Sequence, residues 1–147
     1  MMSIIPTTTG AAKAIGTIIP ELNGKIDGMA LRVPVSDGSI ADMVLKLKKD
    51  VTKEELNNVL KDASETVLKG VMGYTEEPIV STDIIGDPHS SIVDGQSTMV
   101  LGNKSNIVKV LSWYDNEWSF ECRLVDLVKL IDMKMKGEIH NVSNIPN

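Results

Sequence analysis

The stretch Ser112–Trp118, SWYDNEW, holds both tryptophans and one of the two tyrosines of a 147-residue chain in which aromatic residues make up only 3%. The residues before it, Ile107–Leu111, are mostly apolar and β-branched, which is typical of a buried strand. After it, apolar residues recur at helical spacing, and Asp115 stands where its carboxylate can cap the first helical turn. The stretch therefore predicts a strand that passes directly into a helix, from about Asn116 to Lys136.

Two further helices are predicted nearer the N-terminus. Thr9 is placed to cap a helix that runs to Ile19, because the proline that follows cannot continue the helical hydrogen bonding. The segment Thr52–Glu55 has the spacing of a capping box and opens an amphipathic helix. We expect that helix to end at Gly70.

Alternating segments predict the strands. Residues 29–33 alternate large apolar side chains with smaller and charged ones, which predicts a half-buried strand with Arg32 on the opposite face. Residues 42–47 alternate likewise, and short β-rich runs separated by turns fill 78–111. This pattern favours an α+β fold, a mostly antiparallel mixed sheet with helices packed on one face. Residues 137–147 are polar and read as a tail.

Composition narrows the class of protein. Fifteen basic and twenty acidic residues give a net charge of -5 with no basic stripe, which argues against nucleic acid or an anionic membrane as the main partner. No apolar stretch approaches the roughly 20 residues that span a bilayer, and the N-terminus lacks a secretory signal pattern. A single cysteine fits a reducing compartment. The cytoplasm is therefore the expected location.

Several side chains could bind a ligand. Thr7–Gly10 at a helix start could hold an anion, and Arg32 on a neighbouring strand could add forked donors for a phosphate. Without other information, a helix cap and a solvated arginine are the commoner roles. Asn116 carries a carboxamide that could bind another carboxamide, although its position alone favours a helix-capping role.

The histidines and the cysteine do not form a recognisable reactive group in the sequence. His89 and His140 are the only histidines, and their spacing from Cys122 does not predict a metal site. His89 lies in a turn, where an imidazole usually completes local hydrogen bonds. Cys122 falls on an apolar stripe of the last helix, which favours a small buried residue over a nucleophile.

Four segments, in order and at about the expected spacing, resemble the phosphorylating glyceraldehyde-3-phosphate dehydrogenase family. They are IIPTTTGAAKA at Ile4–Ala14, LRVP at Leu31–Pro34, DPHSSIVD at Asp87–Asp94, and SWYDNEW at Ser112–Trp118. The resemblance extends over roughly residues 3 to 131 and concerns only the C-terminal, catalytic half of that enzyme. It implies a catalytic domain at residues 1–136.

The resemblance also implies roles for individual residues. In the family, the Thr-Gly pair and the arginine of the R-V-P segment contact the phosphates of the substrate and of inorganic phosphate. The matching residues are Thr9, Gly10 and Arg32. The asparagine of the SWYDNEW motif contacts the nicotinamide of NAD, which assigns that role to Asn116. The family is glycolytic, cytoplasmic and oligomeric, so we expect a homo-oligomer.

The resemblance places the nucleophilic cysteine, its histidine and the nucleotide-binding fold upstream of Met1. The 147 residues contain no G-x-G-x-x-G motif and no cysteine before Cys122. We therefore assign no catalytic residue, and expect neither activity nor tight NAD binding from this chain alone. Two functions stay open: part of a dehydrogenase completed by a separate nucleotide-binding half, or a non-enzymatic remnant that associates and binds phosphate. A related erythrose-4-phosphate dehydrogenase fits the motifs less well.

Overall fold

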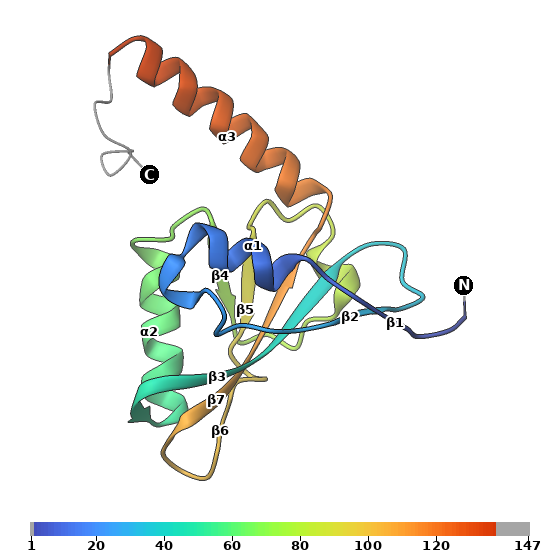
Figure 1. Ribbon diagram of the computed structural model, residues 1–147, viewed down its shortest axis with the longest axis vertical. Coiled ribbons are helices and arrows are strands. Elements are labelled where there is room, and N and C mark those ends of the chain that lie inside the picture. The colour runs from blue at the N-terminus through green and yellow to red at the C-terminus, as the bar shows by residue number, and fades with distance from the viewer. Residues whose placement is uncertain (1, 138–147) are drawn as a thin grey trace. The chain divides into compact units, whose positions relative to one another are not determined.

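The computed structural model describes residues 2–137. Internal contacts divide the chain into two compact units, Met1–Ser36 and Asp37–Asn147, and each is described by itself (Figure 1). The predicted domain boundary at residue 136 stays a prediction. Of the expected tail, residues 138–147 lie outside the described residues.

The first unit is a two-stranded ribbon with one short helix. Its strands β1 (Ile5–Thr7) and β2 (Ala30–Arg32) pair in antiparallel register, and between them lie α1 (Ala11–Ile18) and a single 3-10 turn, η1 (Pro20–Leu22). The helix predicted to end at Ile19 therefore ends one residue earlier, where Pro20 begins the 3-10 turn.

The strand predicted at residues 29–33 is present as β2, but the prediction that it is half-buried is wrong. Leu31 is 59% exposed, and Met29 and Val33 are exposed as well. A two-stranded ribbon has no third strand or covering layer in its own unit, so alternation in the sequence does not give it a buried face.

The second unit contains a five-stranded mixed sheet. Its elements, in chain order, are β3 (Ser39–Val51), α2 (Lys53–Glu65), β4 (Met72–Thr75), the 3-10 helix η2 (Ser81–Ile84), β5 (Ser91–Asp94), β6 (Met99–Val100), β7 (Ser105–Tyr114) and α3 (Trp118–Met135). The strand order is β3-β7-β5-β4, with β6 also paired to β7. Only β4 and β5 pair in parallel, and the other pairs are antiparallel. The α+β prediction is confirmed.

The core of this unit is small and aliphatic. Its buried apolar side chains come from the sheet and from η2: Val51, Ile84, Ile92, Val93, Val108 and Val110. The strand predicted at Ile107–Leu111 lies inside β7 and supplies two of these residues. Because β7 pairs on both edges, it is the central strand that fixes where the following residues emerge.

The capping box predicted for α2 is present. Thr52 Oγ1 accepts the Glu55 N–H at 3.1 Å, and the Glu55 carboxylate accepts the Thr52 N–H at 2.8 Å. The predicted end at Gly70 is wrong, because the helix ends at Glu65. The next residue, Thr66, has φ -121 and ψ -97, outside the helical region, and its hydroxyl donates to the Asp62 carbonyl oxygen.

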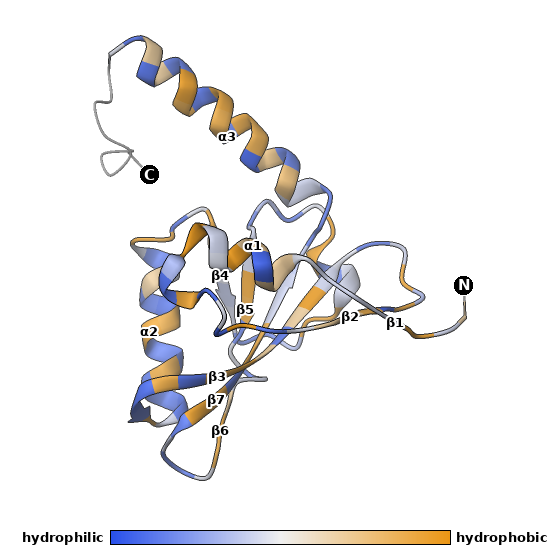
Figure 2. Cartoon of the chain, viewed as in Figure 1, coloured by the Kyte–Doolittle hydropathy of each residue, from blue (hydrophilic) through white to orange (hydrophobic). Residues whose placement is uncertain are grey.

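The last helix, α3, also differs from its prediction. It begins at Trp118 and ends at Met135, inside the expected bounds, but it projects away from the sheet on which we expected it to pack (Figure 1). Figure 2 shows apolar residues recurring along its length. Those that are exposed are Trp118, Phe120, Leu124, Val125, Leu127, Val128, Ile131 and Met135. Among the described residues, no helix has the length and apolar character required to cross a membrane.

Candidate functional site

Asp115, at the junction of β7 and α3, fixes the geometry of the region around it. Its carboxylate is 2% exposed and accepts three backbone N–H groups: Glu117 at 2.9 Å, Trp118 at 2.8 Å and Gly86 at 2.8 Å. The Gly86 hydrogen bond, with those of Trp118 and Glu117, outweighs burial and lowers the pKa of the Asp115 carboxyl. The predicted cap of α3 is confirmed, and the carboxylate remains ionised at neutral pH.

The same carboxylate also joins α3 to the loop after η2, which the sequence did not predict. Gly86 has φ +80, a conformation that favours glycine, and its N–H donates to Asp115 Oδ2. The Gly86-Asp87-Pro88 sequence indicated a turn. It contained no signal that the turn would contact a residue 29 positions further along the chain.

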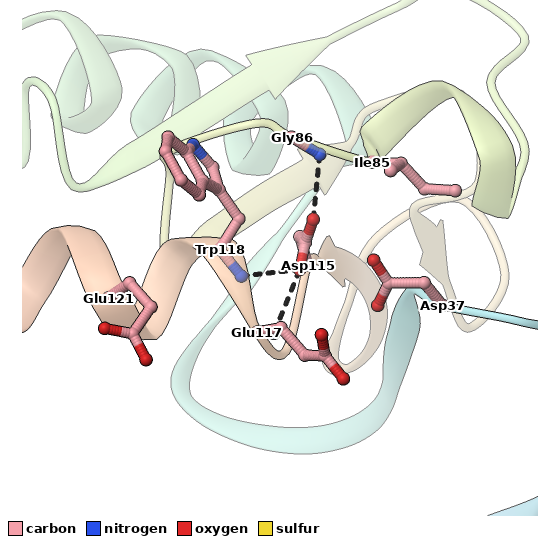
Figure 3. Close-up of a pocket in the computed structure, with 7 residues that line it drawn as sticks. All are labelled: Asp37, Ile85, Gly86, Asp115, Glu117, Trp118 and Glu121. Atoms are coloured by element: carbon pink, nitrogen blue, oxygen red, sulfur yellow. Dashed lines mark hydrogen bonds between the residues drawn. The ribbon is translucent and has the colours of Figure 1, made fainter.

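A pocket of about 380 Å³ opens beside this junction. It is lined by residues of the η2 loop, the start of β3 and the first turn of α3: Asp37, Ile85, Gly86, Asp115, Glu117, Trp118 and Glu121 (Figure 3). Four of the seven are carboxylates, so the pocket disfavours a phosphate and other anions. The anion site predicted from the sequence therefore does not lie here.

Asn116 lies between these carboxylates, but its own side chain already has a partner. The Asn116 Oδ1 atom accepts a hydrogen bond from Ser39 Oγ at 2.9 Å, across the start of β3. No hydrogen bond to its NH₂ group occurs within residues 2–137, so the donor half of the carboxamide remains available. This geometry is compatible with both roles considered for Asn116, helix-start bracing and donation to a ligand carbonyl.

Arg123 is a structural residue that the sequence analysis missed. From α3, its guanidinium pairs with Asp126 at 2.7 Å and donates to Ser90 Oγ at 3.2 Å. Longer hydrogen bonds of 3.4 Å reach the carbonyl oxygens of Gly70 and Pro88. Arg123 therefore ties the first turns of α3 to two loops of the sheet, at long sequence separations that local patterns do not indicate.

Thr9 and Gly10 lie at the start of α1, but the N-cap residue is Gly10 and not the predicted Thr9. Thr9 Oγ1 accepts the Ala11 N–H at 3.2 Å, and the Gly10 carbonyl oxygen accepts the Ala14 N–H at 3.0 Å. Both residues are exposed. The first N–H groups of a helix lack partners within the helix, so this end of α1 can donate to an anion.

Arg32 lies in the same unit, at the other end of the ribbon. In the register of β1 and β2 it is opposite Ile5, whereas Thr7 is opposite Ala30. The chain from Thr7 to Gly10 therefore runs away from Arg32. The side chain of Arg32 is exposed and makes no hydrogen bond or ion pair with the rest of the described chain. A ligand held by all three residues would have to bridge this separation.

His89 and Cys122 do not form a reactive pair. Asp87 Oδ1 accepts the His89 N–H at 2.8 Å and lies 2.7 Å from His89 Nδ1, which confirms the predicted local role. Cys122 is a partly buried free thiol on α3. No hydrogen bond joins it to His89 or to another acid or base of residues 2–137.

Comparison with known proteins agrees with the motifs. Residues 1–116 match the model of the glyceraldehyde 3-phosphate dehydrogenase, C-terminal domain. Glyceraldehyde-3-phosphate dehydrogenase of Borreliella burgdorferi is 62% identical over 130 residues, which is 87% of this chain and 38% of that protein. Glyceraldehyde-3-phosphate dehydrogenase 2 of Bacillus subtilis is 53% identical over 134 residues, 91% of this chain and 39% of that protein.

A yeast relative gives the same result. Glyceraldehyde-3-phosphate dehydrogenase 3 of Kluyveromyces marxianus is 54% identical over 129 residues, 88% of this chain and 38% of that protein. The chain thus spans less than two fifths of the length of these relatives, and what it matches is their C-terminal part. On this evidence the chain belongs to the glyceraldehyde-3-phosphate dehydrogenase family, of which it represents the C-terminal domain.

Proposed function

We propose that this chain is the catalytic-domain part of a phosphorylating, NAD-dependent glyceraldehyde-3-phosphate dehydrogenase, active only when joined by a nucleotide-binding half. The observation that carries the proposal is the 62% identity to a dehydrogenase over 87% of this chain but only 38% of the relative. The larger part of the relative therefore lies outside the matched residues.

The chemistry of the described residues supports inactivity of the chain alone. Thioester formation requires a thiolate beside a general base. The single cysteine, Cys122, has no such base hydrogen-bonded to it, and the imidazole of His89 is engaged by Asp87. A helix-borne thiol of this kind is more consistent with packing than with nucleophilic attack.

Purified chain should therefore give no phosphate-dependent NADH formation with glyceraldehyde 3-phosphate. The same assay on the Cys122→Ser variant is the matched control, because any residual signal that survives the substitution comes from a contaminant. Turnover that depends on Cys122 would overturn the proposal and make this residue the nucleophile.

The proposal assigns weak phosphate or sugar-phosphate binding to Thr9, Gly10 and Arg32. The exposed start of α1 and the unpaired Arg32 support it, while the ribbon register limits how closely they converge. A dissociation constant near 1 mM, or about 4 kcal/mol, is expected. Phosphate should shift the Gly10 amide resonance in the wild-type chain and in Lys25→Ala, but not in Arg32→Ala. An unchanged Gly10 resonance at high phosphate would exclude this assignment.

A second candidate function is association without catalysis, and the exposed side chains of α3 favour it. A helix with eight exposed large apolar residues is an unfavourable surface in water. The chain is then expected to form a homo-oligomer when no nucleotide-binding half is present, in the cytoplasm with the rest of its family. Sedimentation of the purified chain tests this, since a single species at 16.0 kDa would exclude self-association.

A further inference from the structure

We propose that Asn23 is a site of spontaneous deamidation, where the side-chain carboxamide is converted to aspartate and isoaspartate. Asn23–Gly24 is the single Asn-Gly pair in the sequence. Both residues are exposed, in the turn that follows η1. Asparagine is among the thermolabile residues, and a following glycine offers the least steric hindrance to attack on its side chain.

Both reacting groups are free of hydrogen bonds. Within the described residues, the Asn23 carboxamide has no hydrogen-bond partner, and the Gly24 N–H has no acceptor. Two other asparagines differ in this respect. The carboxamide of Asn116 accepts from Ser39, and that of Asn57 donates to the Gly95 carbonyl oxygen at 2.9 Å. These hydrogen bonds hold the amide in place, whereas Asn23 can rotate.

The backbone leaves room for the attack. Asn23 has φ -60 and ψ 126. The Asn23 ψ torsion must rotate to bring the Gly24 nitrogen toward Asn23 Cγ before the reaction. Gly24 has φ +72, and no heavy atom lies within 4 Å of the position that a Cβ would take there. The Gly24 side of this peptide therefore faces open space.

The reaction needs only water and a base. Solvent base removes the Gly24 amide proton, and the nitrogen attacks Asn23 Cγ. A C–N bond forms within a five-membered succinimide, and the bond to the side-chain nitrogen breaks to release ammonia. Water then adds to either ring carbonyl, and opening of the ring gives aspartate or isoaspartate. The oxidation state is unchanged, and the rate rises with pH because the attacking nitrogen must lose a proton.

The three Asp-Gly pairs of the sequence provide a contrast. The N–H of Gly28 donates to Asp27 Oδ1 at 2.8 Å, that of Gly38 donates to Asp37 Oδ1 at 2.6 Å, and that of Gly95 donates to the Thr75 carbonyl oxygen at 2.8 Å. In each pair the side chain ends in a carboxyl group instead of a carboxamide. An ionised carboxylate is a poor electrophile, so the analogous ring closure there is slower than at Asn23.

Modification would disturb the packing of η1 against α1. A Cβ added at the buried Gly16 of α1 would lie 3.1 Å from both the Cα and the Oδ1 of Asn23, so the two residues are already close. Isoaspartate adds a methylene to the main chain at this contact. Either product also adds a negative charge beside the C-terminal half of α1, where the helix dipole disfavours it. The affected unit is the one that carries Thr9, Gly10 and Arg32.

The test follows label from ¹⁸O-water into the intact chain, with digestion afterwards in unlabelled water. The tryptic peptide 14–25 should gain label in a mixture of aspartate and isoaspartate, faster at mildly alkaline than at neutral pH. The Asn23→Gln variant should gain none in that peptide. Asn103 is the internal control, because it is also exposed but precedes Lys104.

Two outcomes would overturn the proposal. One is the absence of label in peptide 14–25 after long alkaline incubation. The other is incorporation at Asn103 as fast as at Asn23, which would show that the Asn23–Gly24 geometry has no special effect. If label enters, the Gly16 amide resonance should shift in parallel with it, because Gly16 contacts the modified residue.

Discussion

Helices α2 and α3 begin in similar ways but differ in what surrounds them. At each helix start a side-chain oxygen accepts a hydrogen bond from a backbone N–H group. The oxygen belongs to Thr52 for α2 and to Asp115 for α3. α2 packs beside β4 and keeps Leu56 and Leu60 partly covered. α3 leaves the sheet after its first turns, and its Val128 is 66% exposed.

This difference shows that a helix start is determined locally and its packing is not. Capping requires only groups within three or four residues, so it appears wherever the sequence supplies them. Covering an apolar stripe requires a second surface. Within the second unit, the described residues offer α2 that surface but not α3. We infer that α3 is completed by a protein surface outside the described part of this unit. The predictions below test how α3 is anchored at its start and whether its apolar side chains are covered.

The largest loss of folding stability is expected from a substitution at the start of α3. Asp115→Ala would leave three backbone N–H groups without their acceptor and should lower the free energy of unfolding by about 3 kcal/mol. Asp115→Asn is the matched control, since it keeps one acceptor oxygen and should cost less. Urea unfolding measures both. An unchanged midpoint for Asp115→Ala would show that α3 is not anchored as described.

Truncation of an apolar side chain should change the free energy of unfolding more in α2 than in α3. Leu60→Ala in α2 removes partly buried carbons and should lower the free energy of unfolding by about 1–2 kcal/mol. Leu127→Ala in α3 removes exposed carbons and should change it by less than about 0.5 kcal/mol in the monomer. Equal effects of the two substitutions would mean that α3 packs against the sheet.

A smaller effect is expected at the α2 cap. Thr52→Ala removes the acceptor of the Glu55 N–H and should cost about 1 kcal/mol. Thr52→Ser retains the hydroxyl and should restore most of that loss. If both variants unfold at the same urea concentration, then the hydroxyl contributes nothing and the capping box is dispensable.

The smallest change in folding stability is expected when the pH is varied near neutrality. Because the pKa of Asp115 is lowered in the folded chain, its contribution to stability is fully present above its unfolded value of about 3.9 and is lost as pH falls through the lower folded value. The stability difference between wild type and Asp115→Asn should therefore be constant near neutrality and shrink in acid. A difference that grows in acid would contradict the direction of the shift.

Local patterns predicted the parts of the fold that depend on neighbouring residues. The α+β class, the strand at Ile107–Leu111, the Asp115 cap and the capping box of α2 all follow from spacings of a few residues. For the candidate site, the same reasoning placed Thr9 and Gly10 at a helix start and Asn116 beside Asp115.

Long-range contacts account for what the sequence did not predict. The Gly86–Asp115 hydrogen bond and the Arg123 contacts join residues 29 to 53 positions apart, and no spacing rule specifies them. The exposure of β2 and the projection of α3 away from its own sheet were not predicted for a related reason. An apolar stripe in the sequence indicates which face needs covering but not whether the covering surface belongs to the same chain.

Co-expression with the N-terminal part of the Borreliella burgdorferi relative, which this chain does not match, tests whether the chain is the catalytic-domain part of a dehydrogenase. We expect phosphate-dependent NADH formation from the pair and none from either part alone. Val128→Asp on the exposed face of α3 should abolish that activity without unfolding the chain. Activity of this chain alone, or an inactive but well-folded pair, would contradict the claim.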